Sequence, residues 1–236
     1  MLTSGYFPTA ERAAAVRSAV PGIDAVGAIT LNGSVGGMNP VAVELAGRSG
    51  ARVVLLRAPD ADGPEGVAAD PIEVVASDGQ VLAATREVLR VIARRDMTLV
   101  TGQLDPAETD AVVDAAAAAG VRRIVVSDPG TTSARTGVDR QRRLAAKGAL
   151  LERSLATPHT GCVPWGLVLE HIRTVGAAHS VLSSGLGGPS GPPAEDGLAL
   201  LADRLLGGGF TEEEIRLMAV QNTRWLTGAD DRRPGA

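Results

Sequence analysis

The chain has few of the residues that mark several common classes of protein. Aromatic residues make up 2% of its 236 residues, and cysteine occurs once, as Cys162. A single cysteine excludes an internal disulfide and a zinc site built from cysteines. Because aromatics are scarce, aliphatic side chains and alanine must fill the core, and a hydrophobic content of 44% is enough for this.

Charge and hydropathy exclude two classes of partner. The net charge is −4 and lysine and arginine form no basic block, whereas non-specific nucleic-acid binding needs clustered cations. No stretch approaches the ~18 uninterrupted apolar residues of a membrane span. The N-terminus also lacks the basic and apolar regions of a signal peptide. We therefore expect a cytoplasmic protein with neither nucleic acid nor membrane as a partner.

Strand-like and helix-like patterns alternate along the chain. Short, nearly continuous runs of Val, Ile and Leu are typical of strands buried on both faces. Six such runs occupy residues 24–31, 51–58, 97–102, 122–128, 149–156 and 180–186. Helical segments lie between them, and Asn39, Asp105 and Thr211 stand where helix N-caps belong. This order predicts an α/β protein with a parallel sheet, a TIM-barrel-like (β/α) repeat.

The number of strands falls short of a closed barrel. Residues 1–7 are a candidate for one more strand, so we expect seven strands or an incomplete barrel rather than eight. Insertions at 59–80 and 187–197 follow strands and so lie on the face where α/β proteins place their sites. We expect one barrel-like domain over residues 1–228 and a disordered tail over 229–236.

Histidine is scarce as well. The three histidines are His159, His171 and His179, and none of them ends a strand-like run. His159 follows the fifth run, on the expected functional face, where it is either a general acid or base or an exposed loop residue. His171 lies inside a helix as a surface or packing residue. His179 precedes the sixth run, at the end of the barrel that serves stability.

Two carboxylates are the main candidates for chemistry. Asp128 ends the fourth run, and Glu152 lies inside the apolar fifth run, where a carboxylate is costly unless it is paired. Glu152 is therefore an acid, base or substrate anchor, or else the ion-pair partner of Arg153 or Arg57. With His159, these carboxylates are the predicted catalytic residues. The predicted substrate contacts are Asn32, Arg57, Gln103, Ser184 and Tyr6.

Several motifs resemble a known family. The chain resembles the amidohydrolase-like metal-dependent hydrolases and, within them, a bacterial group of uncharacterised predicted hydrolases. The shared stretches span nearly the whole chain: YFPTAERA (6–13), GAITLNGSVGGMNPVAVE (27–44), VTGQLDPAE (100–108), GVRRIVVSDPG (120–130), VLSSGLGGPSGPP (181–193) and GFTEEEIRLMAVQN (209–222). The resemblance implies a barrel that holds a metal at the ends of its strands.

The chain departs from that family at the positions of the metal ligands. The family opens with a strand carrying a His-x-His pair, and this chain begins after the position of that strand. Gly5, Gln103 and Asp128 stand where the family has histidine, and Gly185 stands where it has aspartate. Glycine supplies no ligand, and one carboxylate does not make a site. We therefore expect no metal and no other cofactor.

Three functions follow as hypotheses. The favoured one is a metal-independent enzyme that acts on a small molecule by acid–base chemistry of the lyase, isomerase or cyclase type. The second is a metal-dependent hydrolase of C–N or C–O bonds with a rearranged site. The third is a non-catalytic relative that binds a partner. A homodimer that covers the missing strand is expected, since an unpaired sheet edge invites pairing.

Overall fold

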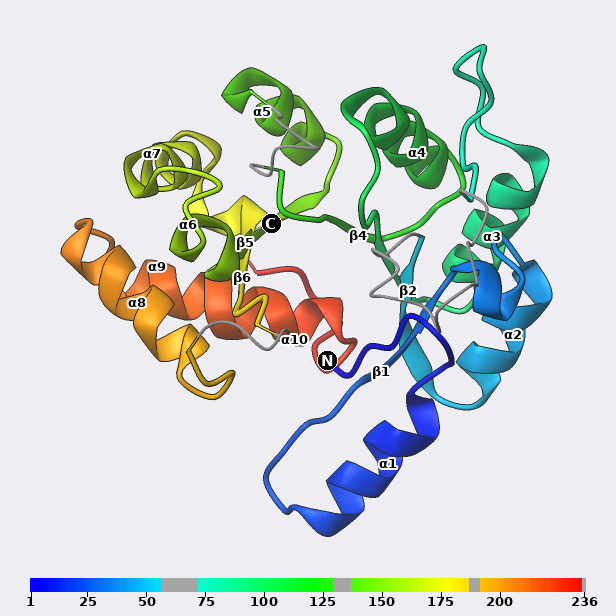
Figure 1. Ribbon diagram of the computed structural model, residues 1–236, viewed down its shortest axis with the longest axis horizontal. Helices are drawn as coiled ribbons and strands as arrows, with labels where there is room; N and C mark the ends of the chain where they lie inside the picture. Colours follow the sequence, from blue (N-terminus) through cyan, green and yellow to red (C-terminus); the bar gives the residue numbers. More distant parts are fainter. Residues whose placement is uncertain (57–71, 130–136, 187–191, 235–236) are drawn as a thin grey trace. The chain divides into compact units, whose positions relative to one another are not determined.

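The six predicted strands are present in one parallel sheet. The computed structural model describes residues 1–56, 72–129, 137–186 and 192–234. Within them the strands follow the chain in the order β1-β2-β3-β4-β5-β6 (Figure 1). Their bounds are Gly27–Thr30 (β1), Ala51–Leu55 (β2), Thr98–Val100 (β3), Arg123–Val126 (β4), Leu150–Ser154 (β5) and Ser180–Ser183 (β6). With a helix between successive strands, the fold is an α/β repeat of the predicted kind.

The N-terminal segment contributes a single bridge rather than a seventh strand. Leu2 pairs in parallel with Gly27, and its N–H donates to the carbonyl of Val26 at 2.8 Å. The Tyr6 N–H then donates to the Ser4 hydroxyl at 3.2 Å, a local bond that turns the chain away. Within the described residues, the candidate seventh strand is thus a single bridge, and the sheet has six strands.

Contacts divide the chain into two compact units, Met1–Ile124 and Val125–Ala236. The single domain predicted for 1–228 stays a prediction. In the N-terminal unit, β1, β2 and β3 carry the fully buried Ile29, Val54 and Leu99. Four helices belong to this unit: α1 (Ala10–Ala19), α2 (Pro40–Arg48), α3 (Ala83–Arg94) and α4 (Pro106–Ala118), with a short 3-10 helix η1 (Gly33–Val35) before α2.

Local capping chemistry starts two of these helices. The Asn39 side chain accepts hydrogen bonds from the N–H groups of Val41 and Ala42 at the start of α2. Asp105 and Glu108 form a reciprocal capping box at the start of α4. Each side chain satisfies N–H groups that a helix start leaves open. These predicted N-caps are confirmed.

An acidic residue links α2 to α3, which lie side by side in Figure 1. Glu44 accepts hydrogen bonds from Arg95, Arg94 and Arg48. The hydrogen bonds from Arg95 and Arg94 lower the pKa of Glu44 to about 2. The Glu44 side chain is partly open to solvent, so the network adds little to stability but links both helices.

The C-terminal unit contains the end of β4, all of β5 and β6, and the remaining helices. Its helices are α5 (Val138–Ala146), α6 (Ala156–His159), α7 (Trp165–Val175), α8 (Gly197–Gly207), α9 (Glu212–Arg216) and α10 (Asn222–Leu226), with a 3-10 turn η2 (Ala177–His179) and a π-helical turn η3 (Leu217–Gln221). Thr211 caps α9 as predicted, in a capping box with Glu214. The last predicted helix is thus three consecutive segments.

A core forms between this unit's strands and helices. It combines Leu155 and Leu182 from the strand side with residues of α7, α8 and the chain from Phe210 to Met218. Its buried members are Leu155, Ile172, Leu182, Leu201, Leu205, Phe210, Ile215 and Met218. Because Leu182 belongs to this core, its side of β6 is the side that faces the helices.

The C-terminal segment makes specific contacts within this unit. Arg233 donates to the carbonyl of Gly148 at 2.8 Å and lies 2.9 Å from Nδ1 of His179. Its guanidinium also lies over the Trp225 ring, 5.3 Å from the centroid. Disorder over 229–236 stays a prediction, and residues 235–236 lie outside the described residues. His179 thus has a structural partner at the start of β6.

Candidate active site

The ends of β4, β5 and β6 carry a group of polar residues. Ser127 and Asp128 follow β4, and Ser154 and Ser183 end β5 and β6. Ser154 is paired with Ser183, and Glu152 with Val181. Parallel strands end at a common edge of the sheet, where α/β proteins place their sites. The predicted pair Asp128 and Glu152 meets at this edge.

Glu152 is held by hydrogen bonds from β6 and from the end of β4. The hydroxyl of Ser183 donates to Oε1 of Glu152 at 2.8 Å. The Ser127 side chain and the Asp128 backbone N–H also hydrogen-bond to the carboxyl group. The residue as a whole is intermediate in exposure, but these three groups enclose its carboxyl end. Glu152 is therefore fixed in one position at the strand edge.

The interior position changes the acidity of Glu152. Burial, followed by the negative charge of Asp128, raises its pKa from 4.5 to about 7, against the opposing effect of the hydrogen bonds from Ser183, Ser127 and Asp128. A carboxyl group with a pKa near neutrality can both give and take a proton at physiological pH.

Asp128 adopts an unusual backbone conformation. Its φ is 29°, in the left-handed region that non-glycine residues rarely occupy. Its Oδ1 accepts a hydrogen bond of 3.2 Å from the N–H of Ser154. The turn thus directs the carboxylate from the end of β4 toward the end of β5. Strain of this kind is found where a side chain must be held in one place.

The alternative partners of Glu152 are not observed. No ion pair joins it to Arg153 among the described residues, and Arg57 lies outside them. Successive side chains of a strand point to opposite faces, so Glu152 and Arg153 cannot meet. Arg153 is paired with Leu182, on the side that faces the helices, and only 5% of its surface is exposed. Of the two readings of Glu152, the structure thus gives no ion pair with Arg153 among the described residues.

Gly185 lies in close contact with the end of β5. Its φ is +60°, and a Cβ atom at this position would lie 2.8 Å from Cβ of Ser154 and 3.1 Å from Cβ of Ala156. Ser154 in turn hydrogen-bonds through its hydroxyl to Thr157 at 3.0 Å. The backbone after β6 therefore approaches β5 too closely for a side chain.

Three more residues of this unit can be placed near or beyond the strand edge. His159 ends the short helix α6 and is exposed. The backbone of Ser184 accepts a hydrogen bond from Ala156 at 3.1 Å. Cys162 is exposed and accepts a hydrogen bond from Thr160. In the described ranges, no three His, Cys, Asp or Glu residues gather in a way that could hold a metal ion.

Three predicted substrate contacts belong to the N-terminal unit. Asn32 follows β1 and is 3% exposed, with its Nδ2 next to Gly5. Tyr6 and Gln103 are exposed. A role in substrate binding stays a prediction for these residues and for Ser184. Arg57, the fifth predicted contact, falls outside the described residues.

Ser183, Ser154 and Ser127 were not among the predicted site residues. A signal was present, because each is a polar residue within an otherwise apolar strand-like run. Their pairing with Glu152 and Asp128 depends on the register between strands, which a single run does not reveal.

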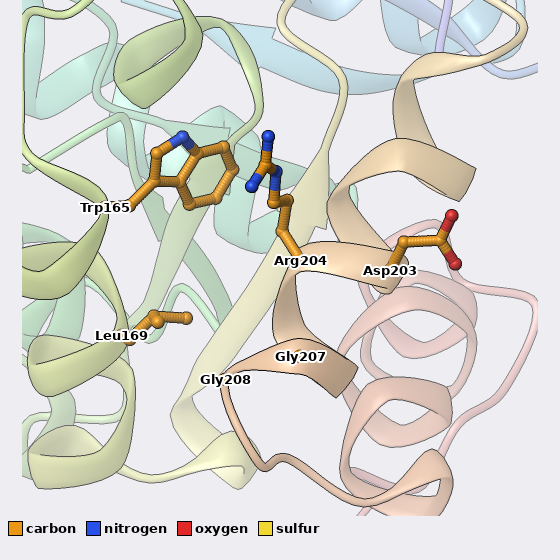
Figure 2. A pocket seen from close by; sticks show the side chains of 6 residues that line it. All are labelled: Trp165, Leu169, Asp203, Arg204, Gly207 and Gly208. Carbon is orange, nitrogen blue, oxygen red and sulfur yellow. The ribbon is translucent and has the colours of Figure 1, made fainter.

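A surface groove of about 330 Å³ lies between α7 and α8. Figure 2 shows Trp165 and Leu169 from α7 facing α8, with the Arg204 guanidinium beside the indole. Arg204 lies 5.7 Å from the ring centroid of Trp165. None of the residues lining this groove is a predicted site residue, and the groove lies between helices rather than at the strand ends.

Solved structures with a similar α/β fold include an amidohydrolase and 2,6-dihydroxybenzoate decarboxylases. An amidohydrolase from Pseudomonas aeruginosa matches with a TM-score of 0.52 and 12% identity, over 79% of this chain and 66% of that one. A 2,6-dihydroxybenzoate decarboxylase from Rhizobium matches with a TM-score of 0.56 and 14% identity, over 94% and 76%. A 2,6-dihydroxybenzoate decarboxylase complexed with 2,6-dihydroxybenzoate gives 0.53 and 13%, over 93% and 75%. The chain thus spans just under two thirds of the amidohydrolase.

A family model identifies the chain more closely in sequence. The model of DUF6282, described as a family of unknown function, matches residues 1–152, more than half of the chain. The protein belongs to this family. No curated protein matches the sequence.

One further property bears on the environment of the protein. Among the described residues, every helix is too short or too polar to cross a bilayer.

Proposed function

We propose that this protein is a metal-independent enzyme that acts on a small molecule by acid–base chemistry of the lyase, isomerase or cyclase type. One observation carries the proposal: Glu152 and Asp128 meet at the edge where the strands end, and Glu152 has a pKa of about 7. A carboxyl group with a pKa near neutrality beside a second carboxyl group can give and take a proton at physiological pH.

The two carboxyl groups have distinct roles in the proposed reaction. Glu152 gives its proton to the atom that gains electrons as a bond breaks. In a lyase step the C–C electron pair stays on carbon, which takes that proton, and Glu152 is left as a carboxylate. The negative charge of Asp128 favours the protonated state of Glu152. The carboxyl of Glu152 then recovers its proton from water.

The carboxylate oxygens at this edge, which could otherwise bind a metal, support a reaction that needs none. Oε1 of Glu152 already accepts the Ser183 hydroxyl, and Oδ1 of Asp128 accepts the Ser154 N–H. Gly185 stands where the resembling family has an aspartate, and the contact with Ser154 leaves no room for a side chain there. These residues do not fit the metal of that family, so the proposal routes no step through a metal.

The likeness to decarboxylases supports the lyase type within this proposal. Decarboxylation breaks a C–C bond and requires protonation at carbon, which is the step assigned to Glu152. The likeness concerns the fold, so it does not name a substrate for this chain. Asn32, Arg57, Gln103, Tyr6, Ser184 and His159 are proposed to orient or assist the substrate, and a homodimer is proposed as the assembly.

Mass balance tests the proposal with no substrate chosen in advance. Wild-type protein, freed of metal with a chelator, is incubated with an extract of small metabolites, and mass spectrometry records which masses fall and rise. A lyase converts one mass into two that sum to it, and an isomerase changes only the retention time. A cyclase that dehydrates its substrate removes one water, whereas a hydrolase gives products that together exceed the substrate by one water.

Two variants serve as controls for this assay. Glu152→Gln and Asp128→Asn keep shape and hydrogen bonding but remove the acid and the charge, so both are expected to lose turnover by about 100-fold or more. Undiminished turnover in Glu152→Gln would refute the assignment. Turnover that returns only with added metal, together with products heavier by one water, would instead establish the rearranged hydrolase.

A further inference from the structure

The groove between α7 and α8 contains a cation that has no anion of its own. Arg204 is exposed and lies over the Trp165 ring, 5.7 Å from its centroid. In the part of the chain that the structure describes, Arg204 forms no ion pair. The carboxylate of Asp203 lies on the side of α8 away from Trp165 (Figure 2). The groove therefore offers an uncompensated positive charge to an acidic group.

The walls of this groove are apolar and leave it open. Trp165 and Leu169 of α7 line one wall, and Gly207 and Gly208 line the other. A Cβ atom at Gly208 would lie 2.9 Å from Leu169, whereas one at Gly207 would have no atom within 4 Å. The two walls thus touch at Gly208 and leave a hollow beside Gly207. Its volume of about 330 Å³ is enough for side chains of a partner.

Exposed leucines extend the apolar surface along α8. Leu200 and Leu206 are 40% and 44% exposed, whereas Leu201 and Leu205 of the same helix are buried in the core. Leu200 lies one helical turn before Arg204 and therefore shares its side of the helix. Exposed leucines beside an open groove and an arginine are typical of a protein–protein interface.

The chain itself supplies an acidic segment next to this groove. Residues 212–214 are the only three consecutive acidic residues in the sequence. Glu214 takes part in the capping box of α9, whereas Glu212 and Glu213 are exposed. Neither of these two forms an ion pair within the described ranges. Since α9 contacts α8, the cation and the acids lie on neighbouring helices of the same unit.

A two-fold axis brings unlike charges of such a surface together twice. In a two-fold symmetric dimer, the groove of each copy faces the acidic turn of the other. Arg204 then meets Glu212 and Glu213 in two equivalent places, and the exposed leucines of α8 become covered. Unlike charges arranged in this way select the partner and fix its orientation.

The outer strands of the sheet have partners within the chain. At β1, the Thr9 N–H donates to the carbonyl of Ala28, and the Ala28 N–H donates to the Thr9 hydroxyl, both at 2.9 Å. At β6, the Asn222 side chain donates to the carbonyls of Ser180 and Ala177 at 2.7 and 3.2 Å. Contacts of this kind keep a sheet edge from pairing with another chain. They favour a helical surface over a sheet edge as the place for a second copy.

We propose that two copies of this chain associate through α8 and α9, with Glu212 and Glu213 of each copy in the α7–α8 groove of the other, beside Arg204. The surface contains none of the residues assigned to acid–base chemistry. The inference therefore goes beyond the proposed function and does not depend on it.

Sedimentation of the full-length protein measures the association directly. Wild type should be a dimer whose Kd rises by about 10-fold between ~50 mM and ~500 mM salt, because salt screens the charge contacts. Arg204→Glu and the double variant Glu212→Arg/Glu213→Arg each place like charges together, so each should raise Kd by about 100-fold or more. A monomeric wild type would leave the groove to another partner and overturn the proposal, as would a dimer that persists in Arg204→Glu.

Mixing the two charge-reversed proteins tests whether these residues meet. The acidic groove of Arg204→Glu then faces the basic turn of Glu212→Arg/Glu213→Arg, and the second contact keeps its natural charges. An equal mixture should form a heterodimer, although each variant alone is a monomer. A mixture that stays monomeric, with both variants folded by amide NMR, would overturn the assignment.

Two further variants separate this contact from net charge and from loss of folding. Arg142 is exposed on α5, outside the groove, so Arg142→Glu changes the net charge equally and should remain a dimer. Equal dissociation of Arg142→Glu would overturn the proposal. Arg204→Gln removes the charge with a smaller change of surface, and should raise Kd by about 10-fold even if Arg204→Glu does not fold. An unchanged Kd in folded Arg204→Gln would also overturn it.

Discussion

The hydroxyl of Ser183 lies 2.8 Å from Oε1 of Glu152, across the two neighbouring strands β5 and β6. This bond favours the ionised form of Glu152 and so opposes the burial that raises its pKa. The acidity of Glu152 therefore results from several competing contacts, and each can be altered by a single substitution.

Removal of the Ser183 hydroxyl should make Glu152 a weaker acid. In Ser183→Ala the carboxylate loses a donor, so its titration midpoint should move above 7 by about 1 unit. Carboxyl-carbon NMR across a pH series measures this midpoint. Ser180→Ala is the matched control, because Ser180 lies at the other end of β6 and donates to Gly176. A midpoint that stays in place in Ser183→Ala would contradict the assigned contact.

Glu152 should also make stability depend on pH. Its pKa in the folded chain is about 7, above the ordinary value of 4.5, so the folded state binds the proton more tightly than the unfolded state. The contribution of Glu152 to stability is therefore greatest below pH 4.5 and is lost as the pH rises through about 7. The difference between these two pKa values corresponds to a change in the free energy of unfolding of up to about 3 kcal/mol.

Urea unfolding of wild type and Glu152→Gln measures this effect. Glutamine stays neutral, so the variant should gain stability relative to wild type at about pH 8 and much less at about pH 5. An equal difference at both pH values would mean that the carboxyl group is not buried in the way described.

Gly185→Ala should destabilise the C-terminal unit by about 1–3 kcal/mol, because a Cβ would meet Ser154 and because φ is +60°. Gly161→Ala is the matched control, since Gly161 has φ +77° with no atom within 4 Å of its Cβ position. The difference between the two variants in thermal or urea unfolding measures the steric part. An equal loss of unfolding free energy in the two variants would show that the contact of the new Cβ with Ser154 does not destabilise the fold.

Acidification should release the C-terminal segment. Burial, followed by the charge of Arg233, lowers the pKa of His179 below 6.5. The folded state therefore binds the proton more weakly than the unfolded state, and the contact is fully formed above pH 6.5 and weakens as the pH falls below it. The Trp225 indole signal in NMR reports this release, because Arg233 lies over that ring. A variant with Arg233→Met should show the shifted signal at every pH.

Much of the fold was predictable from local patterns. All six apolar runs are strands, and Asn39, Asp105 and Thr211 cap helices as predicted. Capping depends on residues within one turn, so the sequence contains the whole interaction. The first seven residues failed as a strand because their pairing ends at Leu2, a limit imposed by non-local contacts.

The site was predictable only in part. Asp128 and Glu152 stood out because a carboxylate in or after an apolar strand needs an explanation. Of the alternatives left open for Glu152, the ion pair with Arg153 is disfavoured by the alternation of side chains on a strand. Ser183 could not be assigned, since its contact depends on how β5 and β6 are aligned.

The alternation on β5 has an evolutionary consequence. Two adjacent codons specify an acid for the open edge and a cation for the layer under the helices. A one-residue insertion or deletion ahead of them would exchange their faces, turning the guanidinium toward Ser183 and the carboxylate toward the apolar core. New chemistry can therefore arise at this edge when side chains are replaced. A change in the length of β5 would instead place a charged side chain in the apolar core and destabilise the fold.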